Sequence, residues 1–394
     1  MDLMTGFPPE PDQRVTLSNW RKPPFNRWAF NHVSELVPSA FVRSAAHANP
    51  LQADHRGLSG FRLSHAGRSF GLHEWLEGTF TDSMVVMKDG KVAFETYAAG
   101  QSPVVPHIWM SVSKSILGLV AGVVAARGQL DVEAPLTEVI SELEGTAFDG
   151  ATVQDALDMR VGIRFDEDYL ATAGAIIEYR KSHLWDPVPV GESPTDMRSF
   201  LLTLAERDGE HGGRLHYVSP NTDLLGWVLE RATGTRYADL VGETLWQPVQ
   251  AERDAYITVD RLGAPRCAGG FCATPRDIAR IGRLFVTGGR HGGVQVVPEG
   301  WIRDIVDFDG ADAWNKGDFF DFFGSAKMHY RSQWYVLHGE QPIIQGFGVF
   351  GQHLFIDPTA DLVIAKCSSQ PLPMDPSFMS LTLAGVEKLR AMFR

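Results

Sequence analysis

The sequence predicts an α/β protein of the α+β type, in which an antiparallel sheet is flanked by helices and a mainly α-helical domain is inserted. Three observations indicate this fold class. Strand-like runs occur near both ends of the chain, helical periodicity dominates the middle, and the closing segment 377–393 has a helical pattern. We therefore expect an N-terminal arm (1–40), an α/β domain (41–110 and 260–394) and a helical domain (111–259), with the functional site at their junction.

The composition is typical of a folded, soluble protein. Of the 394 residues, 44% are hydrophobic and 10% aromatic, and 36 basic against 48 acidic residues give a formal net charge of −12. An acidic chain disfavours nucleic acid and anionic membranes, so we expect neither as a partner. The first residues show neither the basic region nor the apolar run of a secretion signal, which favours a cytoplasmic location.

The cysteines and histidines indicate no metal site. Cys267, Cys272 and Cys367 lack a zinc or redox spacing and are expected to be reduced, structural thiols. The 13 histidines show no clustered ligand pattern, so we expect no bound metal ion.

The N-terminal third should form an arm followed by a hairpin. Prolines and four aromatic residues between positions 20 and 30 predict an extended arm pinned by aromatic packing. Segment 83–97 contains two β-type runs around Asp89-Gly90, which is the signal of a hairpin with a type I′ turn.

The middle of the chain is predicted to be mostly helical, and the C-terminal part returns to strands. Helical periodicity and end signals occur at 116–126, 133–145, 152–159, 194–208, 221–234 and 274–285. Strand-like runs follow at 333–338, 348–356 and 362–368. We expect these strands to form an antiparallel sheet that the N-terminal hairpin completes and the helix at 377–393 covers.

One polar cluster runs directly into an apolar helix pattern. Ser111 and Lys114 are three residues apart, so on a helix that begins at Ser111 their side chains lie within hydrogen-bonding reach. The first turn leaves N–H groups unpaired, and that of Ser111 can stabilise an oxyanion. We predict Ser111 as a nucleophile activated by Lys114, with a chance Ser-x-x-Lys match as the alternative. Gly118 and Gly122 predict close packing of another element, and Gly128 the helix end.

A candidate proton shuttle, Tyr217, precedes the predicted helix 221–234. A phenol whose pKa is lowered by a nearby ammonium can take the serine proton and pass it to the leaving atom. The alternative is a tyrosine that only closes the helix cap. The presence of Ser111 and Lys114 favours the catalytic interpretation.

Three other patterns have structural interpretations. Segment 67–71 matches a nucleophile elbow, but a buried strand before it and an apolar helix after it are missing. Segment 346–351 matches a dinucleotide fingerprint but runs into a strand instead of a helix, which excludes nicotinamide and flavin binding. The four phenylalanines of 319–323 fit core packing better than a wall of a substrate pocket.

At these residues the sequence resembles the penicillin-recognising serine hydrolases, which include class C β-lactamases, D-alanyl-D-alanine peptidases and related esterases. Ser111 and Lys114 look like the family's Ser-x-x-Lys, and 217–219 falls on its Tyr-x-Asn. Ser219 replaces the asparagine, so an amide contact to substrate would have to come from Asn221.

The third motif of that family, Lys-Thr-Gly or His-x-Gly, falls on 346–348. Gly346 stands where the motif has its cation, whereas Gly348 is kept. The resemblance implies an oxyanion hole formed by the N–H groups of Ser111 and Val349. Because β-lactam substrates carry a carboxylate, the missing cation predicts weak lactamase activity. If activity were higher, Arg331 would be the first candidate to supply the charge.

A narrower resemblance, to the 6-aminohexanoate-dimer (nylon-oligomer) hydrolases, covers nearly the whole chain. It includes the arm at 17–30, the Ser111 segment, 166–169, 217–223 and 348–352. It implies a serine β-lactamase-like, two-domain architecture, an acyl-enzyme route, no cofactor and often a homodimer. It also implies that Tyr169 binds substrate, for which a surface aromatic is the alternative. Ser219, Gly348 and Trp334 are further candidates for substrate contact.

The sequence therefore predicts a serine hydrolase that cleaves small amides and esters. The expected substrates are 6-aminohexanoate linear dimer-type amides and short-chain carboxylic esters. A carboxylesterase or a D-amino-acid or peptide amidase without nylon-oligomer activity is the first alternative. A catalytically silent binding protein of the same fold is the second.

Overall fold

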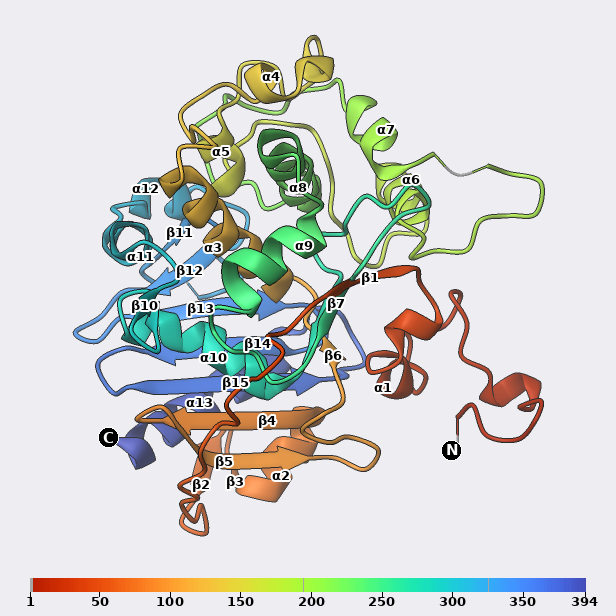
Figure 1. The fold of residues 1–394 in the computed structure, drawn as a ribbon. Helices are drawn as coiled ribbons and strands as arrows, with labels where there is room; N and C mark the ends of the chain where they lie inside the picture. Colours follow the sequence, from red (N-terminus) through yellow and green to blue (C-terminus); the bar gives the residue numbers. More distant parts are fainter. Residues whose placement is uncertain (1–2, 194, 325) are drawn as a thin grey trace.

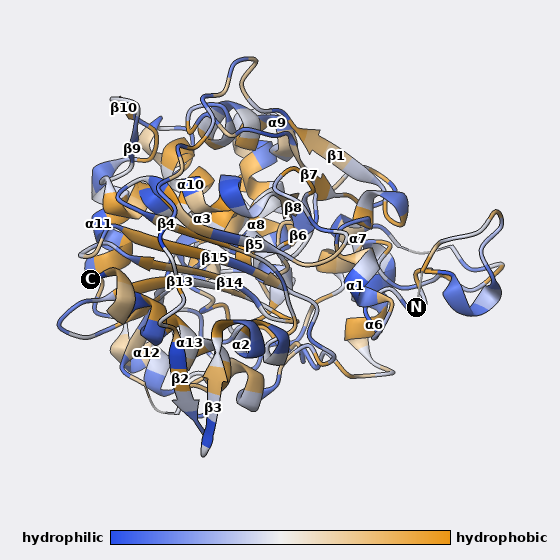
Figure 2. Cartoon of the chain, turned by 90° about the horizontal axis from the view of Figure 1, so that it is seen from below, coloured by the Kyte–Doolittle hydropathy of each residue, from blue (hydrophilic) through white to orange (hydrophobic). Residues whose placement is uncertain are grey.

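The computed structural model describes residues 3–193, 195–324 and 326–394, and a seven-stranded antiparallel sheet forms its centre (Figure 1). The strand order is β11–β12–β13–β14–β15–β4–β5, so the N-terminal hairpin completes the C-terminal sheet, as predicted. The strands are β4 (Thr81–Lys88), β5 (Lys91–Tyr97), β11 (Met328–Arg331), β12 (Trp334–Leu337), β13 (Ile343–Gly348), β14 (Gln352–Asp357) and β15 (Leu362–Ser368). Hydrophobic residues concentrate along these central strands, and hydrophilic ones towards the periphery (Figure 2).

Two turns between neighbouring strands of this sheet test the sequence predictions. The β4–β5 hairpin turns at Asp89 and Gly90, whose φ angles of 52° and 74° fit the predicted type I′ turn. The predicted continuous strand 348–356 is wrong. Phe350 and Gly351 have φ angles of 63° and 87°, so the chain reverses there between β13 and β14.

Helices cover both faces of the sheet. α10 (Pro275–Val286) packs on β14, β15 and β4, while α13 (Pro376–Phe393) and α2 (Leu72–Gly78) lie on the opposite side (Figure 1). A Cβ at Gly282 would lie 2.7 Å from Val363, and one at Gly385 2.0 Å from Trp75, so both helices need glycine to approach this closely. The predicted helices 274–285 and 377–393 are confirmed.

A group of helices lies above the sheet in Figure 1, around α3 (Val112–Ala126) and α8 (Ser219–Thr233). The others are α4 (Leu136–Val139), α5 (Val153–Leu157), α6 (Ala175–Ser182), α7 (Met197–Leu202) and α9 (Tyr237–Val241). The helices predicted at 133–145 and 194–208 are shorter than expected, and residue 194 lies outside the described residues. α8 ends at Gly234, whose φ of 67° confirms the glycine stop.

Helix α3 joins the helices to the sheet. Added Cβ atoms would lie 2.0 Å from the Ser332 carbonyl oxygen at Gly118 and 2.5 Å from Trp301 at Gly122, which confirms the predicted close packing. Gly128, with φ 72°, follows the end of α3 as expected. One hydrophobic cluster runs from the sheet through α3 into α8. The division of the chain into domains therefore stays a proposal.

A second sheet, which the sequence did not predict, has the order β1–β7–β8–β6. Its strands are β1 (Ser39–Val42), β6 (His107–Ile108), β7 (Ala255–Thr258) and β8 (Phe271–Ala273). Strands of two to four residues are too short to show an alternating pattern. The sheet matters for the site because β6 leads directly into Ser111.

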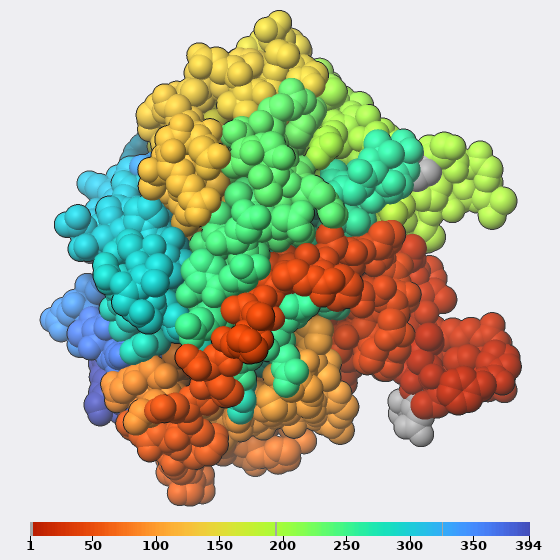
Figure 3. Space-filling model, in the orientation of Figure 1, coloured from red at the N-terminus to blue at the C-terminus, as the bar shows by residue number. Residues whose placement is uncertain are grey.

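The N-terminal arm, red in Figure 3, lies on the surface of the molecule and includes α1 (Asn26–Ala29). Trp20 and Phe30 are buried in one cluster with Trp185 and Phe350, and the Trp20 indole donates a 3.0 Å hydrogen bond to the Trp185 carbonyl. The predicted aromatic pinning of the arm is confirmed.

Short helical turns lie at Pro11–Gln13, Val33–Glu35, Ser141–Leu143 and Gly242–Trp246. The remaining strands and α-helices lie at the periphery of the fold. They are β2 (Arg62–His65), β3 (Arg68–Gly71), β9 (Arg290–His291), β10 (Val294–Gln295), α11 (Glu299–Asp307) and α12 (Ala311–Asn315). Cys267, Cys272 and Cys367 are free and buried. No helix in the described part of the chain has the length and apolar character needed to cross a membrane.

Candidate active site

Ser111 stands at the N-terminus of α3, where the chain turns sharply. The preceding residue, Met110, has a φ of 46°, a left-handed conformation that costs a residue with a side chain about 1 kcal/mol or more. The turn allows the chain to pass from β6 into α3 and leaves Ser111 partly exposed at the cavity surface.

Lys114 lies beneath the serine and is buried to 1% exposure. Its Nζ is 2.8 Å from Ser111 Oγ, 2.8 Å from the Ala268 carbonyl oxygen and 3.1 Å from Ser219 Oγ. Burial lowers the pKa of Lys114 to about 7, against the opposing effect of the Glu167 charge. A substantial fraction of the amine is therefore neutral near neutral pH.

Glu167 is a site residue that sequence reasoning missed. Its carboxylate accepts short hydrogen bonds from both the backbone N–H and the hydroxyl of Ser219. Ser219 is thereby oriented so that its oxygen accepts from Lys114. Asn221 does not supply the amide that the family motif suggests, because it is fully buried beside Met159 and lines neither cavity described below.

Tyr217 is brought to the same place by the loop before α8. Its ring centroid lies 5.0 Å from Lys114 Nζ, and its hydroxyl hydrogen-bonds with Ser111. The expectation of a lowered phenol pKa is wrong. Burial raises the pKa of Tyr217, and the hydrogen bond with Ser111 offsets this only in part. Tyr217 is thus a neutral phenol in the resting site.

The β13 edge lies against the serine turn. A Cβ at Gly348 would lie 2.5 Å from the Trp109 carbonyl oxygen and 3.0 Å from Met110 Cβ, so only glycine allows this approach. Val349 follows at the start of the turn and lines the same cavity as Ser111. Within the described part of the chain, neither the Ser111 nor the Val349 N–H donates a loop or turn hydrogen bond.

Position 346 cannot hold the cation of the family's third motif without a rearrangement. A Cβ at Gly346 would already lie 3.1 Å from Ser115 Oγ and 3.2 Å from a Val112 methyl group on α3. Its glycine therefore reflects close packing of β13 on α3.

Two cavities meet at Ser111. We call the first the aromatic cavity; its walls include Tyr217, Phe319, Phe322, Phe323, Tyr335 and Phe347. The preference for core packing at 319–323 was incomplete, because three of these phenylalanines line the cavity while packing on one another. We call the second the arginine cavity; its walls include Arg21, Glu167, Arg180, His183, Ser219 and Arg266.

Tyr169 lies between the two cavities and lines both. Its hydroxyl hydrogen-bonds with Glu167, and burial is the main cause that raises its pKa. Its backbone carbonyl accepts a 2.8 Å hydrogen bond from Arg180. The structure therefore places Tyr169 beside the serine rather than on an outer surface.

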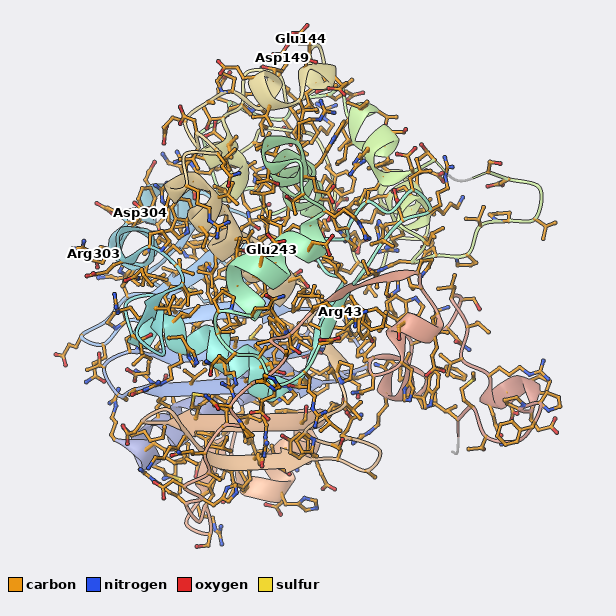
Figure 4. All side chains as sticks on the ribbon, in the orientation of Figure 1. Arg43, Glu144, Asp149, Glu243, Arg303 and Asp304 are labelled. Atoms are coloured by element: carbon orange, nitrogen blue, oxygen red, sulfur yellow. The ribbon has the colours of Figure 1, made fainter. Side chains whose placement is uncertain are left out.

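Trp334 and Arg331 lie elsewhere, and both assignments need correction. Trp334 is fully buried and packs on Phe285 at 4.5 Å between ring centroids, on the core side of β12. Arg331 is bound to Asp158 at 2.6 Å and to Asp304 at 2.7 Å, and Figure 4 places Asp304 at the α11 edge of the molecule. Neither residue lines the cavities at Ser111.

A buried ionic network supports the site from below. Asp223 binds Arg266 and Tyr179 through one carboxylate oxygen and accepts a 2.8 Å hydrogen bond from the Ala268 N–H through the other. Since the Ala268 carbonyl binds Lys114, this network fixes one of the three partners of the lysine. Across the described residues, no group of three or more His, Cys, Asp or Glu side chains could hold a metal ion.

The fold, and the pairing of a cavity-facing serine with a buried lysine, define a serine hydrolase of the β-lactamase type. The family model described as "Beta-lactamase" matches residues 77–383, and the chain belongs to this family. The 6-aminohexanoate-dimer hydrolase of Paenarthrobacter ureafaciens is 38% identical to it over 358 residues, which cover 91% of this chain and 89% of the relative.

Two solved structures extend the comparison. A Bacillus anthracis protein, provisionally named a 6-aminohexanoate-dimer hydrolase, superposes with a TM-score of 0.87 at 26% identity over 98% of each chain. A family VIII carboxylesterase superposes with a TM-score of 0.58 at 16% identity, over 80% of this chain and 95% of the other. The predicted fold class is confirmed, and the second structure shares the fold alone.

Proposed function

We propose that this serine hydrolase cleaves small linear amides and esters through an acyl-enzyme on Ser111. Lys114 is the general base, Tyr217 delivers the proton to the leaving atom, and the N–H groups of Ser111 and Val349 bind the oxyanion. Tyr169, Ser219 and Gly348 border the substrate. The hydrogen bond of 2.8 Å between Lys114 and Ser111, with a lysine pKa of about 7, is the observation that carries the proposal.

The contacts of Lys114 suit a neutral amine. Nζ donates hydrogen bonds to the Ala268 carbonyl and to Ser219 Oγ and lies 2.8 Å from Ser111 Oγ. When the amine is neutral, those two N–H bonds can remain while its lone pair accepts the Ser111 O–H. During acylation the serine proton moves to Lys114 and the Tyr217 hydroxyl protonates the leaving nitrogen or oxygen. The lysine ammonium then returns a proton to Tyr217. In deacylation, Lys114 takes a proton from the water that attacks the acyl group, and this proton passes to the Ser111 oxygen as the acyl–oxygen bond breaks.

The substrates we propose are 6-aminohexanoate linear dimer-type amides and short-chain carboxylic esters. The identity to the Paenarthrobacter enzyme supports the amide, and a cavity of aromatic side chains beside Ser111 suits a methylene chain. The alternatives, a carboxylesterase or peptide amidase without nylon-oligomer activity and a catalytically silent protein, are distinguished by the same assay.

The test measures hydrolysis of a chromogenic short-chain ester and of the linear aminohexanoate dimer. Mass spectrometry of the protein quenched during turnover then looks for a covalent acyl adduct. The native chain should turn over both substrates and carry an acyl adduct on the peptide that contains Ser111. Ser111→Ala should lose turnover and adduct together. Unchanged activity of that variant would refute the whole scheme.

The setting we propose is the cytoplasm, with small-molecule substrates, no nucleic acid or membrane partner, and a homodimeric state. The acidic net charge of −12 supports the absence of nucleic acid and membrane partners, and the family resemblance supports the homodimer.

A further inference from the structure

Three guanidinium groups, those of Arg21, Arg180 and Arg266, gather in the arginine cavity. They lie close enough for their charges to interact. Burial, together with the charges of Arg180 and Arg266, lowers the pKa of Arg21 to about 10 against the opposing effect of Asp186. Arginine side chains carry a positive charge in proteins, so three like charges lie together in the cavity wall.

Two of the three arginines have carboxylate partners inside the protein. Arg21 is paired with Asp186, and Arg266 with Asp223. The remaining acidic group of the cavity, Glu167, accepts hydrogen bonds from the backbone N–H and hydroxyl of Ser219, hydrogen-bonds with the Tyr169 hydroxyl, and lies close to Lys114.

Arg180 is the arginine that has no such partner. It is 8% exposed, and its guanidinium donates only to backbone carbonyls, those of Asp168, Tyr169 and Ala171, at 2.8 to 3.2 Å. Throughout the described ranges, no carboxylate lies within 4.0 Å of it. The cavity therefore holds a buried positive charge without a counter-ion, which is costly unless a ligand supplies one.

His183 indicates that the missing partner also accepts hydrogen bonds. Its ring is fully buried between Tyr179 and Trp185, at 4.8 and 5.3 Å between centroids, and lines the cavity. Neither ring nitrogen has a hydrogen-bond partner among the described residues, and the same is true of Arg266 Nε. Burial and the arginine charges lower the pKa of His183, so the ring is neutral and offers one N–H donor.

We infer that the arginine cavity is a subsite for a carboxylate of the substrate, held by Arg180 with His183 and Arg266. The inference rests on the proposed function, because the subsite adjoins Ser111 and would anchor one arm of the substrate while the aromatic cavity receives the other. Position 346, where the family's third motif would place a cation, is a glycine packed closely on α3. Selectivity for an acidic substrate therefore comes from the other side of the serine.

The same carboxylate can belong to either half of the substrate. In N-butyladipamate it lies on the acyl half, and in 6-(pentanoylamino)hexanoate it lies on the leaving half, as in the linear aminohexanoate dimer. The corresponding carboxamides are neutral compounds of nearly the same shape. Comparing each acid with its carboxamide isolates the charge, and comparing the two acids identifies the half that enters the arginine cavity.

The experiment measures binding of these four compounds to Ser111→Ala by calorimetry, so that it does not depend on turnover. One of the two acids should bind about tenfold or more tightly than its carboxamide, as expected for a charge-assisted bidentate contact. Arg180→Gln in the same background should reduce this ratio to near one, and Arg180→Lys should restore part of it. His183→Phe, which keeps the aromatic stack, should reduce the ratio by a few-fold.

Because Arg180 also holds the Tyr169 loop, carboxamide binding in each variant reports on loop damage, and only the acid-to-carboxamide ratio is diagnostic. Arg331→Gln is the matched control, since it removes a partly buried arginine outside both cavities, and its ratio should equal that of the parent. Equal binding of acid and carboxamide in the parent, or a ratio that survives Arg180→Gln, overturns the inference. A ratio that behaves as expected in a chain without hydrolase activity refutes the proposed function and leaves the subsite standing.

Discussion

The two cavities that meet at Ser111 differ in the chemistry of their walls. The aromatic cavity is walled mainly by rings that pack on one another. The arginine cavity is walled by buried charges that are paired, bridged or left without a partner. The same nucleophile, Ser111, can therefore serve all substrates, while the two cavities select among them independently. The aromatic cavity selects by the apolar area that it buries, and the arginine cavity selects by charge.

The catalytic groups lie where the two cavities meet, so they should act on every substrate. Lys114→Ala should therefore lower kcat/KM for esters and amides alike, by a factor of about 10² to 10⁴ as for other general bases. In the native chain, the neutral amine is the active form and the lysine pKa is about 7. The rate should thus rise with pH through about 7 and level off above it.

A pH–rate profile of kcat/KM for one ester and one amide checks both points. A flat profile between pH 5 and 9, or an inflection near the ordinary lysine pKa of about 10.4, would contradict the role given to Lys114. A loss confined to one substrate class would show that the lysine serves one cavity instead of the shared chemistry.

The aromatic cavity should act through apolar area. Each methylene group that it buries contributes about 0.8 kcal/mol, or roughly a fourfold gain in kcat/KM. Two series of esters test this: one lengthens the acyl chain from two to six carbons, and the other lengthens the alcohol over the same range. The gain in kcat/KM per methylene should appear in the series whose chain enters the cavity. Phe323→Ala removes a ring from the wall and should flatten the gain to about twofold or less per methylene.

The shortest ester of each series is the internal control, because it has the fewest methylene groups for the cavity to bury. An unchanged slope in Phe323→Ala for both series would remove the aromatic cavity from substrate binding. It would return the phenylalanines of 319–323 to the packing role that their sequence pattern first indicated.

The sequence predicted the parts of the site that depend on short-range geometry. Ser111 and Lys114 are one helical turn apart, so their contact follows from the helix alone. Tyr217 followed from its place before a predicted helix and from the family's Tyr-x-Asn, Val349 followed from the family's third motif, and both line the cavity beside Ser111. Gly348 also followed from the motif, although its steric reason, contact with Trp109, appears only in the folded chain.

The parts that were missed depend on long-range contacts. Glu167 reaches Ser219 across 52 residues, and Arg266 reaches Asp223 across 43, so no local pattern indicates either pair. Trp334 was misplaced because β12 is covered on both faces, and alternation in such a strand does not reveal which side faces the cavity.

Tyr169, which lies between the two cavities, should have the smallest and most selective effect. Amide cleavage requires the nitrogen to pyramidalise and be protonated before it leaves, whereas an ester oxygen leaves more readily. A hydroxyl near that nitrogen therefore helps amides selectively, by about 1 to 2 kcal/mol or roughly tenfold. Tyr169→Phe should lower the amide-to-ester ratio of kcat/KM by about that factor, measured with the aminohexanoate dimer and a short-chain ester.

The ratio is the informative quantity because Tyr169 also shapes both cavities. Its ring remains in Tyr169→Phe, and its backbone carbonyl can still accept from Arg180, so the loop keeps its anchor. Equal losses on amide and ester would mean that the hydroxyl acts on pocket shape through its contact with Glu167. No loss on either substrate would mean that the side chain separates the two cavities without touching the reacting atoms.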